Sequence, residues 1–343
     1  MRVHEFDYDL PSESIAQTPV EPRDASRLLV VDRRNGSLSH RHFRDLPDFL
    51  RPEDVLVIND TRVLPARLLG RKRVTGGRVE LMLLHPAGGD DLWEVLVRPG
   101  KRLPPGAAVQ FSDGLEATIL ERTPSGGRIA RFSWDQEMPF ATVLSRVGQV
   151  PLPPYIHANL ADPERYQTVY ATASGSAAAP TAGLHFTPSL LERVKSLGIA
   201  TATVTLHVGL GTFRPVQVDE VEEHEMHAEY YEVSPEAAAL INARKNAGGR
   251  LVAVGTTSAR TMESVASPDG TVHAGAGWTD IFIYPGYRFR AVDSLVTNFH
   301  LPRSTLLMLV SAFAGRETVL NAYQEAVRQG YRFYSFGDAM LII

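Results

Sequence analysis

The 343-residue sequence contains no cysteine. This absence excludes disulfides, thiolate zinc sites, iron–sulfur clusters and cysteine nucleophiles, so any chemistry must use oxygen and nitrogen groups. A long hydrophobic run is also lacking, because the longest apolar stretch, Leu306 to Ala314, is too short to span a bilayer. Acidic residues such as Glu5 and Asp7 stand where a secretory signal needs an apolar core. We therefore expect a cytoplasmic protein that does not associate with membranes.

Several familiar catalytic motifs are missing as well. The sequence has no G-x-x-x-x-G-K-[ST] and no G-x-S-x-G, which excludes a P-loop NTPase and a nucleophile elbow. The segment from His207 to Gly211 begins like a dinucleotide fingerprint, but Arg214 occupies the third glycine position. His224 and His227 lie one residue too close together for a zincin helix. We expect no metal.

Charge is distributed unevenly along the chain, although the net charge of −4 gives no overall sign of a nucleic-acid binder. Residues 219–232 carry seven acids and no Lys or Arg. Residues 61–79 carry no acid and six cations: Arg62, Arg67, Arg71, Lys72, Arg73 and Arg78. We interpret this basic run as a local docking surface for a polyanion. The alternative is that both runs are solvated surface.

Short segments bounded by Gly, Pro or Asp follow one another between residues 62 and 133. Six of them are typical of strands: 63–69, 79–84, 93–97, 107–111, 115–120 and 128–132. This spacing predicts a small all-β barrel or sandwich. The segment Pro151–Pro154 then predicts an extended connector.

Strands alternate with helices after this connector. Thr187 as N-cap and Pro188 predict a helix that ends at Gly198. Further strands are expected at 200–208, 251–254 and 281–284, and further helices at 235–246, 255–265, 303–315 and 317–329. Residues 1–60 contain two strand-like segments without a core of their own. We therefore predict a mixed α/β main domain, residues 1–60 and 150–343, with a small all-β barrel domain inserted at 61–149.

Three segments rich in small residues adjoin predicted strands or helices. They are Pro180–Thr187, Gly209–Thr212 and Gly255–Arg260. Ligands in α/β domains bind just past the carboxyl ends of strands, and helix N-termini favour anionic groups, so we expect the three segments to converge on one crevice. Each candidate could instead have a purely structural role without any part in function. His185 and His207 could be core histidines, and Arg260 could form a surface ion pair. Asp280 could cap a turn, Asn298–Pro302 could be only a loop, and Trp278 and Tyr284 could be core aromatics.

Long sequence strings across nearly the whole chain carry a family resemblance. They are Phe6–Pro11, Glu21–Leu29, Asn59–Arg67, Ala179–Thr187, Thr205–Phe213, Gly255–Ser258, Gly277–Gly286 and Thr297–Pro302. In these strings the sequence resembles the S-adenosylmethionine:tRNA ribosyltransferase-isomerase family of the queuosine pathway.

The resemblance implies a two-domain enzyme that acts on the wobble base of certain tRNA anticodons. Its acceptor would be 7-aminomethyl-7-deazaguanine in the tRNA, and S-adenosylmethionine would be its cosubstrate. The ribosyl group would be transferred and isomerised to an epoxycyclopentane-diol, giving epoxyqueuosine-tRNA, adenine and methionine. We expect the enzyme to work as a monomer.

This reaction requires a base near the ribose C5′, whose protons are acidified by the neighbouring sulfonium. Histidine titrates near 6.5, so His185 and His207 are the first candidates. Asp280 or Glu229 would bind the aminomethyl cation or the sulfonium, or replace the histidines as base. The methionine carboxylate would lie on the Thr256–Ser258 helix start with Arg260. The full set expected to bind the cosubstrate is Thr181, Gly183, Phe186, Gly209, Gly211, Thr212, Thr256, Thr257, Ser258, Arg260, Trp278, Tyr284, Asn298 and His300.

Two other functions stay open at this point. One is an RNA-binding module without catalysis, in which the barrel arginines do all the work. The other is an ordinary methyltransferase, which would leave S-adenosylhomocysteine as product. Adenine release on mixing with S-adenosylmethionine and acceptor tRNA would decide between the enzyme and the RNA-binding module. Mass spectrometry of the modified nucleoside is the most informative single experiment.

Overall fold

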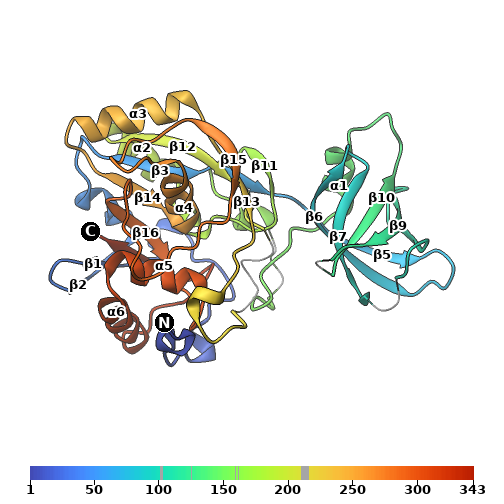
Figure 1. Ribbon diagram of the computed structural model, residues 1–343, viewed down its shortest axis with the longest axis horizontal. Coiled ribbons are helices and arrows are strands. Elements are labelled where there is room, and N and C mark those ends of the chain that lie inside the picture. Colours follow the sequence, from blue (N-terminus) through green and yellow to red (C-terminus); the bar gives the residue numbers. More distant parts are fainter. Residues whose placement is uncertain (101–102, 125, 159, 161, 210–215) are drawn as a thin grey trace. The chain divides into compact units, whose positions relative to one another are not determined.

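The chain divides into two compact units in a computed structural model, which describes residues 1–100, 103–124, 126–158, 160, 162–209 and 216–343 (Figure 1). The α/β unit comprises residues 1–61, 153–173 and 179–343, and the barrel unit comprises residues 62–152 and 174–178. None of the helices among the described residues is both long and apolar enough to span a membrane.

A nine-stranded mixed sheet forms the centre of the α/β unit, in the order β15-β13-β12-β3-β14-β16-β17-β1-β2. Its strands are β1 (Arg27–Asp32), β2 (Ser37–His42), β3 (Val55–Asn59), β12 (Ala200–Leu206), β13 (Glu229–Val233), β14 (Leu251–Val254), β15 (Gly275–Thr279), β16 (Ser294–Asn298) and β17 (Ala339–Ile342). The four strands β12, β3, β14 and β16 are mutually parallel. Every residue of β3, β14 and β16 is buried, as expected of a sheet covered on both faces.

Helices cover both faces of this sheet. Its α-helices are α2 (Pro188–Ser196), α3 (Pro235–Asn246), α4 (Gly255–Val265), α5 (Thr305–Ala314) and α6 (Arg316–Arg328). Short 3₁₀ turns are η1 (Val3–Phe6), η2 (Ser12–Ser14), η3 (Arg23–Ala25), η4 (Phe43–Phe49), η6 (Pro163–Tyr166), η7 (Thr181–His185) and η9 (Val221–Glu223). Three helices begin at side-chain caps, because Thr187, Ser234 and Ser304 each accept a hydrogen bond from a backbone N–H of the first turn.

Alternating residues of the strands build two hydrophobic layers. In β3, Val55 and Val57 pack into the layer that also contains Ile241 of α3. Leu56 and Ile58 pack into the opposite layer, whose members include Leu190 of α2 and Phe43 of η4. A period of two thus places successive side chains on opposite faces, and both faces are needed for the core.

The barrel unit is a closed antiparallel barrel with strand order β10-β7-β6-β5-β8-β9. Its strands are β5 (Arg67–Lys72), β6 (Arg78–Gly88), β7 (Leu92–Arg98), β8 (Ala108–Gln110), β9 (Glu116–Arg122) and β10 (Arg128–Ser133). The helix α1 (Phe140–Val147) adds Phe140, Val143 and Leu144 to the barrel core. β4 (Thr61–Val63) pairs with β11 (Ala173–Ser176) in a two-stranded sheet. The predicted fold class, an α/β main part with a small barrel, is confirmed.

Some predicted elements are wrong in detail. The expected strand at 63–69 is divided around Pro65, which has no N–H to donate to a ladder. The expected strand at 281–284 is irregular chain, and its apolar side chains pack against the core instead. The strand β13 begins inside the acidic run and was not predicted, because its two glutamates interrupt the apolar pattern that indicates a strand.

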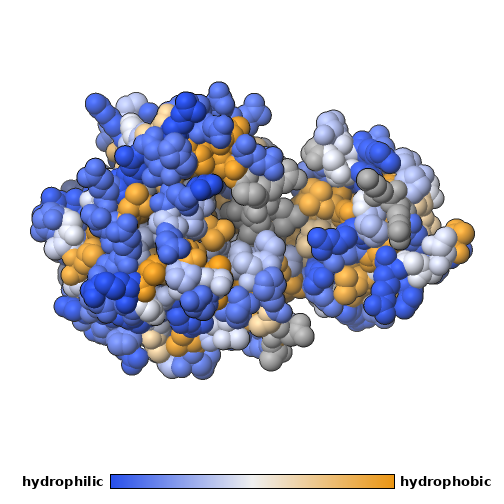
Figure 2. Space-filling view, turned by 90° about the horizontal axis from the view of Figure 1, so that it is seen from below, coloured by the Kyte–Doolittle hydropathy of each residue, from blue (hydrophilic) through white to orange (hydrophobic). Residues whose placement is uncertain are grey.

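Hydrophobic residues on the face drawn in Figure 2 occur in small patches between hydrophilic ones, as on most folded domains. The large hydrophobic side chains exposed among the described residues include Val74, on the barrel, and Trp278, on β15. A tryptophan exposed to 65% is unusual enough to need an explanation.

Candidate active site

The carboxyl ends of the four parallel strands meet at one edge of the sheet in the α/β unit. Asn59 ends β3, His207 follows β12, Gly255 follows β14 and Asn298 ends β16. β17 runs antiparallel to β16, and β1 runs parallel to β17, so β1 starts at the edge where β16 ends. Ser26, the residue just before β1, therefore lies at this edge as well. The described parts of the segments expected to converge, including Gly209 and Gly255, therefore lie on one side of the sheet, where ligands of α/β proteins bind.

His185 lies in a closed hydrogen-bond network at this edge. The Asn298 Oδ1 atom accepts from the Thr181 hydroxyl at 2.8 Å, and the Asn298 Nδ2 atom donates to the backbone carbonyl of Tyr334 at 3.3 Å. The same Nδ2 atom lies 3.1 Å from His185 Nε2, so Nε2 must accept. The proton is then on Nδ1, which lies 2.7 Å from Ser26 Oγ. Both ring nitrogens of His185 are occupied.

Burial, together with the charges of Arg23 and Arg332, lowers the pKa of His185 to about 3. The ring is only 4% exposed and stacks on Phe43 with centroids 4.9 Å apart. A neutral imidazole with both nitrogens hydrogen-bonded is a poor proton acceptor at neutral pH. These contacts favour a framework role for His185 over the role of base.

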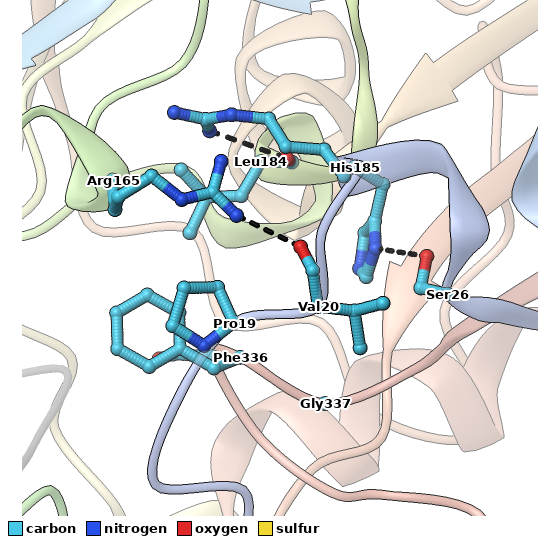
Figure 3. A pocket seen from close by; sticks show the side chains of 10 residues that line it. Pro19, Val20, Ser26, Arg165, Leu184, His185, Phe336 and Gly337 are labelled. Carbon is cyan, nitrogen blue, oxygen red and sulfur yellow. Dashed lines mark hydrogen bonds between the residues drawn. The ribbon is translucent and has the colours of Figure 1, made fainter.

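A small open pocket lies beside His185 (Figure 3). Its volume is about 270 Å³ when the solvent space at its mouth is included. Its walls include two arginines. Arg165 donates to the carbonyl of Val20 at 2.8 Å, and Arg23 donates to the carbonyl of Leu184 at 3.3 Å. Their guanidinium groups thus hold the backbone around the pocket.

His207 has a more open environment. Thr61 Oγ1 lies 2.8 Å from His207 Nδ1, and the ring stacks on Tyr230 with centroids 5.8 Å apart. Among the residues that the structure describes, Nε2 has no hydrogen-bond partner. Partial burial lowers the pKa of His207, while the charges of Asp60 and Glu232 oppose this shift. His207 is therefore neutral at pH 7 with a ring nitrogen available.

Asn59, Asp60 and Thr61 fix the strand ends around His207. Asn59 is fully buried; its Oδ1 atom accepts from the backbone N–H groups of Thr61 and Leu206 at 3.1 and 3.0 Å. Asp60 accepts from the hydroxyls of Thr205 and Thr172 at 2.7 and 2.8 Å. We did not name these residues as site residues from the sequence. The signal that could have indicated them is a polar Asn-Asp-Thr directly after a buried strand.

A buried ion pair joins the next two segments. Glu229 and Arg260 contact each other with side chains 7% exposed, so Arg260 is not a surface residue. Glu229 also accepts from the backbone N–H of Gly209 at 3.0 Å, and Arg260 Nε donates to the carbonyl of Ile281 at 3.2 Å. This pair connects the end of β12 to α4. Its carboxylate is already engaged, which favours a positioning role for Glu229.

The remaining candidates differ in their surroundings. Phe186 is fully buried against Phe43, which favours a packing role over ligand contact. His300 is 8% exposed, lies with Nε2 2.7 Å from Thr297 Oγ1, and has its pKa lowered to about 3 by burial. A Cβ atom on Gly183 would come within 2.2 Å of the Tyr170 hydroxyl, so a side chain is excluded there.

The other aromatic candidates lie on or near the edge strand β15. Trp278 contacts Tyr230 edge-on with centroids 5.8 Å apart, so His207, Tyr230 and Trp278 form a continuous aromatic row. Asp280 is exposed, and Tyr284 packs on Phe282 at 5.0 Å. Gly211 and Thr212 lie outside the described residues.

The predicted tRNA-binding cations lie in the barrel unit. Arg71 and Arg78 face each other across the β5–β6 ladder and are exposed. Arg67 pairs with Glu80 at 2.9 Å, and the exposed Arg73 lies 3.6 Å from Glu116. Arg62 and Lys72 are partly buried. Among the described residues, no group of three or more His, Asp or Glu side chains could hold a metal ion.

The fold, together with the polar residues at the strand edge, is that of an α/β enzyme with two units, one of which is a β-barrel. The sequence profile of the queuosine biosynthesis protein family matches residues 3–342, and the chain belongs to this family. A relative from Moorella thermoacetica is 64% identical and one from Symbiobacterium thermophilum 63% identical, both over 100% of each chain. Both are named S-adenosylmethionine:tRNA ribosyltransferase-isomerase.

A solved structure supports the same relationship. The crystal structure of an S-adenosylmethionine tRNA ribosyltransferase from Thermotoga maritima is 40% identical, covers 99% of this chain and 100% of its own, and superposes with a TM-score of 0.57. The resemblance found in the sequence is confirmed.

Proposed function

We propose that this protein is an S-adenosylmethionine:tRNA ribosyltransferase-isomerase. It transfers and isomerises the ribosyl group of S-adenosylmethionine onto 7-aminomethyl-7-deazaguanine at the wobble position of tRNA, and releases adenine and methionine. Relatives of this name are 56–64% identical over the full chain, which supports the reaction. The structural observation that carries the proposal is the half-buried His207 at the strand edge, with Nδ1 bound to Thr61.

His207 acts as the base of this reaction. The Thr61 hydroxyl accepts the Nδ1 proton, which leaves the lone pair of Nε2 to take a proton from C5′ of the donor. A lowered pKa keeps the imidazole in its neutral form at pH 7. Asp60 and Glu232, whose charges reach His207, stabilise the imidazolium that forms and suit the positively charged sulfonium or aminomethyl group. The exposed Asp280 is a third carboxylate for such a cation.

The exposed arginines of the β5–β6 ladder bind the tRNA backbone. Guanidinium groups suit phosphate oxygens, and the chain as a whole is acidic, so a local cationic surface is needed. We also propose that the barrel, residues 61–149, is a separately folded insertion. Limited proteolysis should then cleave first near residues 60 and 150, and a single cooperative unfolding transition without such cleavage would contradict two domains.

Because its substrate is tRNA, the enzyme acts in the cytoplasm. We also propose that it acts as a monomer.

One assay tests the function. The enzyme is mixed with S-adenosylmethionine and tRNA that carries 7-aminomethyl-7-deazaguanine, and adenine release and the mass of the modified nucleoside are measured. Adenine together with an epoxyqueuosine nucleoside is the expected result. S-adenosylhomocysteine would indicate a methyltransferase instead, and tRNA binding without adenine would indicate an RNA-binding module.

A further inference from the structure

Two buried polar atoms of the helix α4 have no hydrogen-bond partner among the described residues. They are the hydroxyl oxygen of Thr257 and the terminal nitrogen NH2 of Arg260, one helical turn apart. The other donors of the Arg260 guanidinium are engaged by Glu229 and by the carbonyl of Ile281. A buried donor without an acceptor destabilises a fold, so such atoms are rare and often point to a ligand.

The Thr257 hydroxyl lies at the N-terminal end of α4. A Cβ atom built on Gly255, the first residue of the helix, would be 3.5 Å from the Thr257 hydroxyl oxygen. Helical side chains tilt toward the N-terminus of their helix, which directs Arg260 the same way. No side chain caps this end of α4. Its first N–H groups have no acceptor within the helix, so they add further donors and the positive end of the helix dipole.

We propose that this end of α4 is a carboxylate subsite, which holds the carboxylate of the methionine part of S-adenosylmethionine. This assignment rests on the proposed function. Thr257 and Arg260 NH2 donate to the carboxylate oxygens, together with the free N–H groups of the first turn. Ser258, by contrast, uses its hydroxyl proton on the carbonyl of Val254 at 2.9 Å and is a framework residue.

The charge of the subsite favours a carboxylate over a phosphate. Glu229 already neutralises the guanidinium of Arg260, so the remaining attraction suits a single negative charge. A carboxylate carries one charge, whereas a phosphate monoester carries about two at pH 7.

The distance to His207 is consistent with the size of the donor. β12, which leads to His207, and β14, which leads to α4, are separated only by β3, so their ends lie about 10 Å apart. The five bonds from the methionine carboxylate to C5′ extend about 6 Å. Contacts of about 3 Å at each end bring the span of the extended donor to about 12 Å, so a slightly bent donor matches this separation. A donor held at α4 by its carboxylate thus reaches His207 with C5′.

The test compares two ligands, S-adenosylmethionine and its decarboxylated analogue, by calorimetry with the full-length enzyme. Thr257→Val removes the hydroxyl but keeps the shape of the side chain. We expect it to weaken S-adenosylmethionine binding by about tenfold, the effect of one hydrogen bond to a charged group, and to change binding of the analogue by less than about twofold. Arg260→Lys keeps the charge beside Glu229 and removes NH2, and should show the same selective loss.

Thr261→Val is the matched control, because this hydroxyl lies one turn further along α4 and donates to the carbonyl of Thr257 at 3.0 Å. It should affect both ligands equally. If Thr257→Val weakened both ligands equally, or neither, the carboxylate subsite would be refuted. Failure of the wild-type enzyme to release adenine would instead refute the proposed function, whatever the two ligands show.

Discussion

The two units of this protein present their polar side chains in different ways. In the barrel, Arg71 and Arg78 lie exposed on neighbouring strands, and Arg73 lies exposed in the turn after β5. In the α/β unit, the polar groups of the strand edge are largely buried and connected by hydrogen bonds, as around His185 and the Glu229–Arg260 pair.

The difference follows from what each unit has to recognise. Exposed cations attract a polyanion over a long range, are screened by salt and need little geometric precision. Groups that move protons need fixed positions and a controlled pKa, which burial and hydrogen bonds provide. Changes in the α/β unit should therefore affect turnover, and changes in the barrel should affect tRNA affinity.

The largest expected effect belongs to His207→Ala. Loss of the base should lower turnover about 10² to 10⁴-fold while tRNA affinity stays within about twofold of wild type. His207→Gln should be equally slow, because an amide hydrogen-bonds but does not shuttle protons. Single-turnover kinetics at saturating S-adenosylmethionine measures this. His157→Ala, an exposed histidine elsewhere in the α/β unit, is the control. A change in S-adenosylmethionine affinity alone would make His207 a binding residue.

The barrel counterpart is the triple variant with Arg71, Lys72 and Arg73 replaced by Ala. We expect weaker tRNA binding at unchanged S-adenosylmethionine affinity, and a salt dependence reduced by about 0.7 to 0.9 for each lost phosphate contact. Binding titrations at several salt concentrations test this. The control replaces Arg34, Arg41 and Arg44, three exposed arginines of the α/β unit, for the same change in charge. If both triple variants weakened tRNA binding equally, the barrel would not be the tRNA-binding unit.

Within the α/β unit, His185→Ala should act on stability more than on turnover. The substitution leaves Ser26 and Asn298 without their buried partner, and we expect a loss of about 1 to 3 kcal/mol in the free energy of unfolding. Chemical denaturation measures it, with His157→Ala again as control. A turnover defect as large as that of His207→Ala in a fully folded variant would restore His185 as a candidate base.

The pH dependence of stability gives a second measure of His185. The unfolded chain takes up a proton near pH 6.5, whereas folded His185 has a pKa of about 3. Stability from this residue is therefore fully present above pH 6.5 and is lost as the pH falls toward 3, by up to about 1.4 kcal/mol per pH unit. His185→Gln removes this proton uptake, so the free energy of unfolding should fall less steeply with decreasing pH, by the slope that one proton contributes. An unchanged slope would show that His185 is not buried in its neutral form.

The smallest expected effect is on the pH profile of turnover. His207 is active when neutral, and its pKa is lowered, so kcat/KM should fall only below pH 6.5. Glu232→Gln removes a charge that raises the pKa of His207, and should move this acid limb to lower pH. A movement to higher pH would contradict the assignment of His207 as base.

Much of the fold was predictable from the sequence. The turn residues between 62 and 133 predicted a small β module, and Thr187 with Pro188 predicted the start of α2. These features depend on local chemistry, which a short stretch of sequence contains. The strand β13 was missed because its burial depends on β12 and β15, far away in the chain.

The sequence by itself determined the family, the class of fold and several of the polar residues that adjoin strand ends, although not Asn59, Asp60 and Thr61. It could not distinguish His185 from His207, which occur in similar small-residue segments. Only the tertiary structure decided that Ser26 and Asn298, more than a hundred residues away from His185, occupy both nitrogens of that ring. It also decided that His207 keeps Nε2 open among the described residues and that Arg260 is buried against Glu229. The physical reason is that pKa, tautomer and accessibility depend on which distant residues surround a group, and the local sequence does not contain that information.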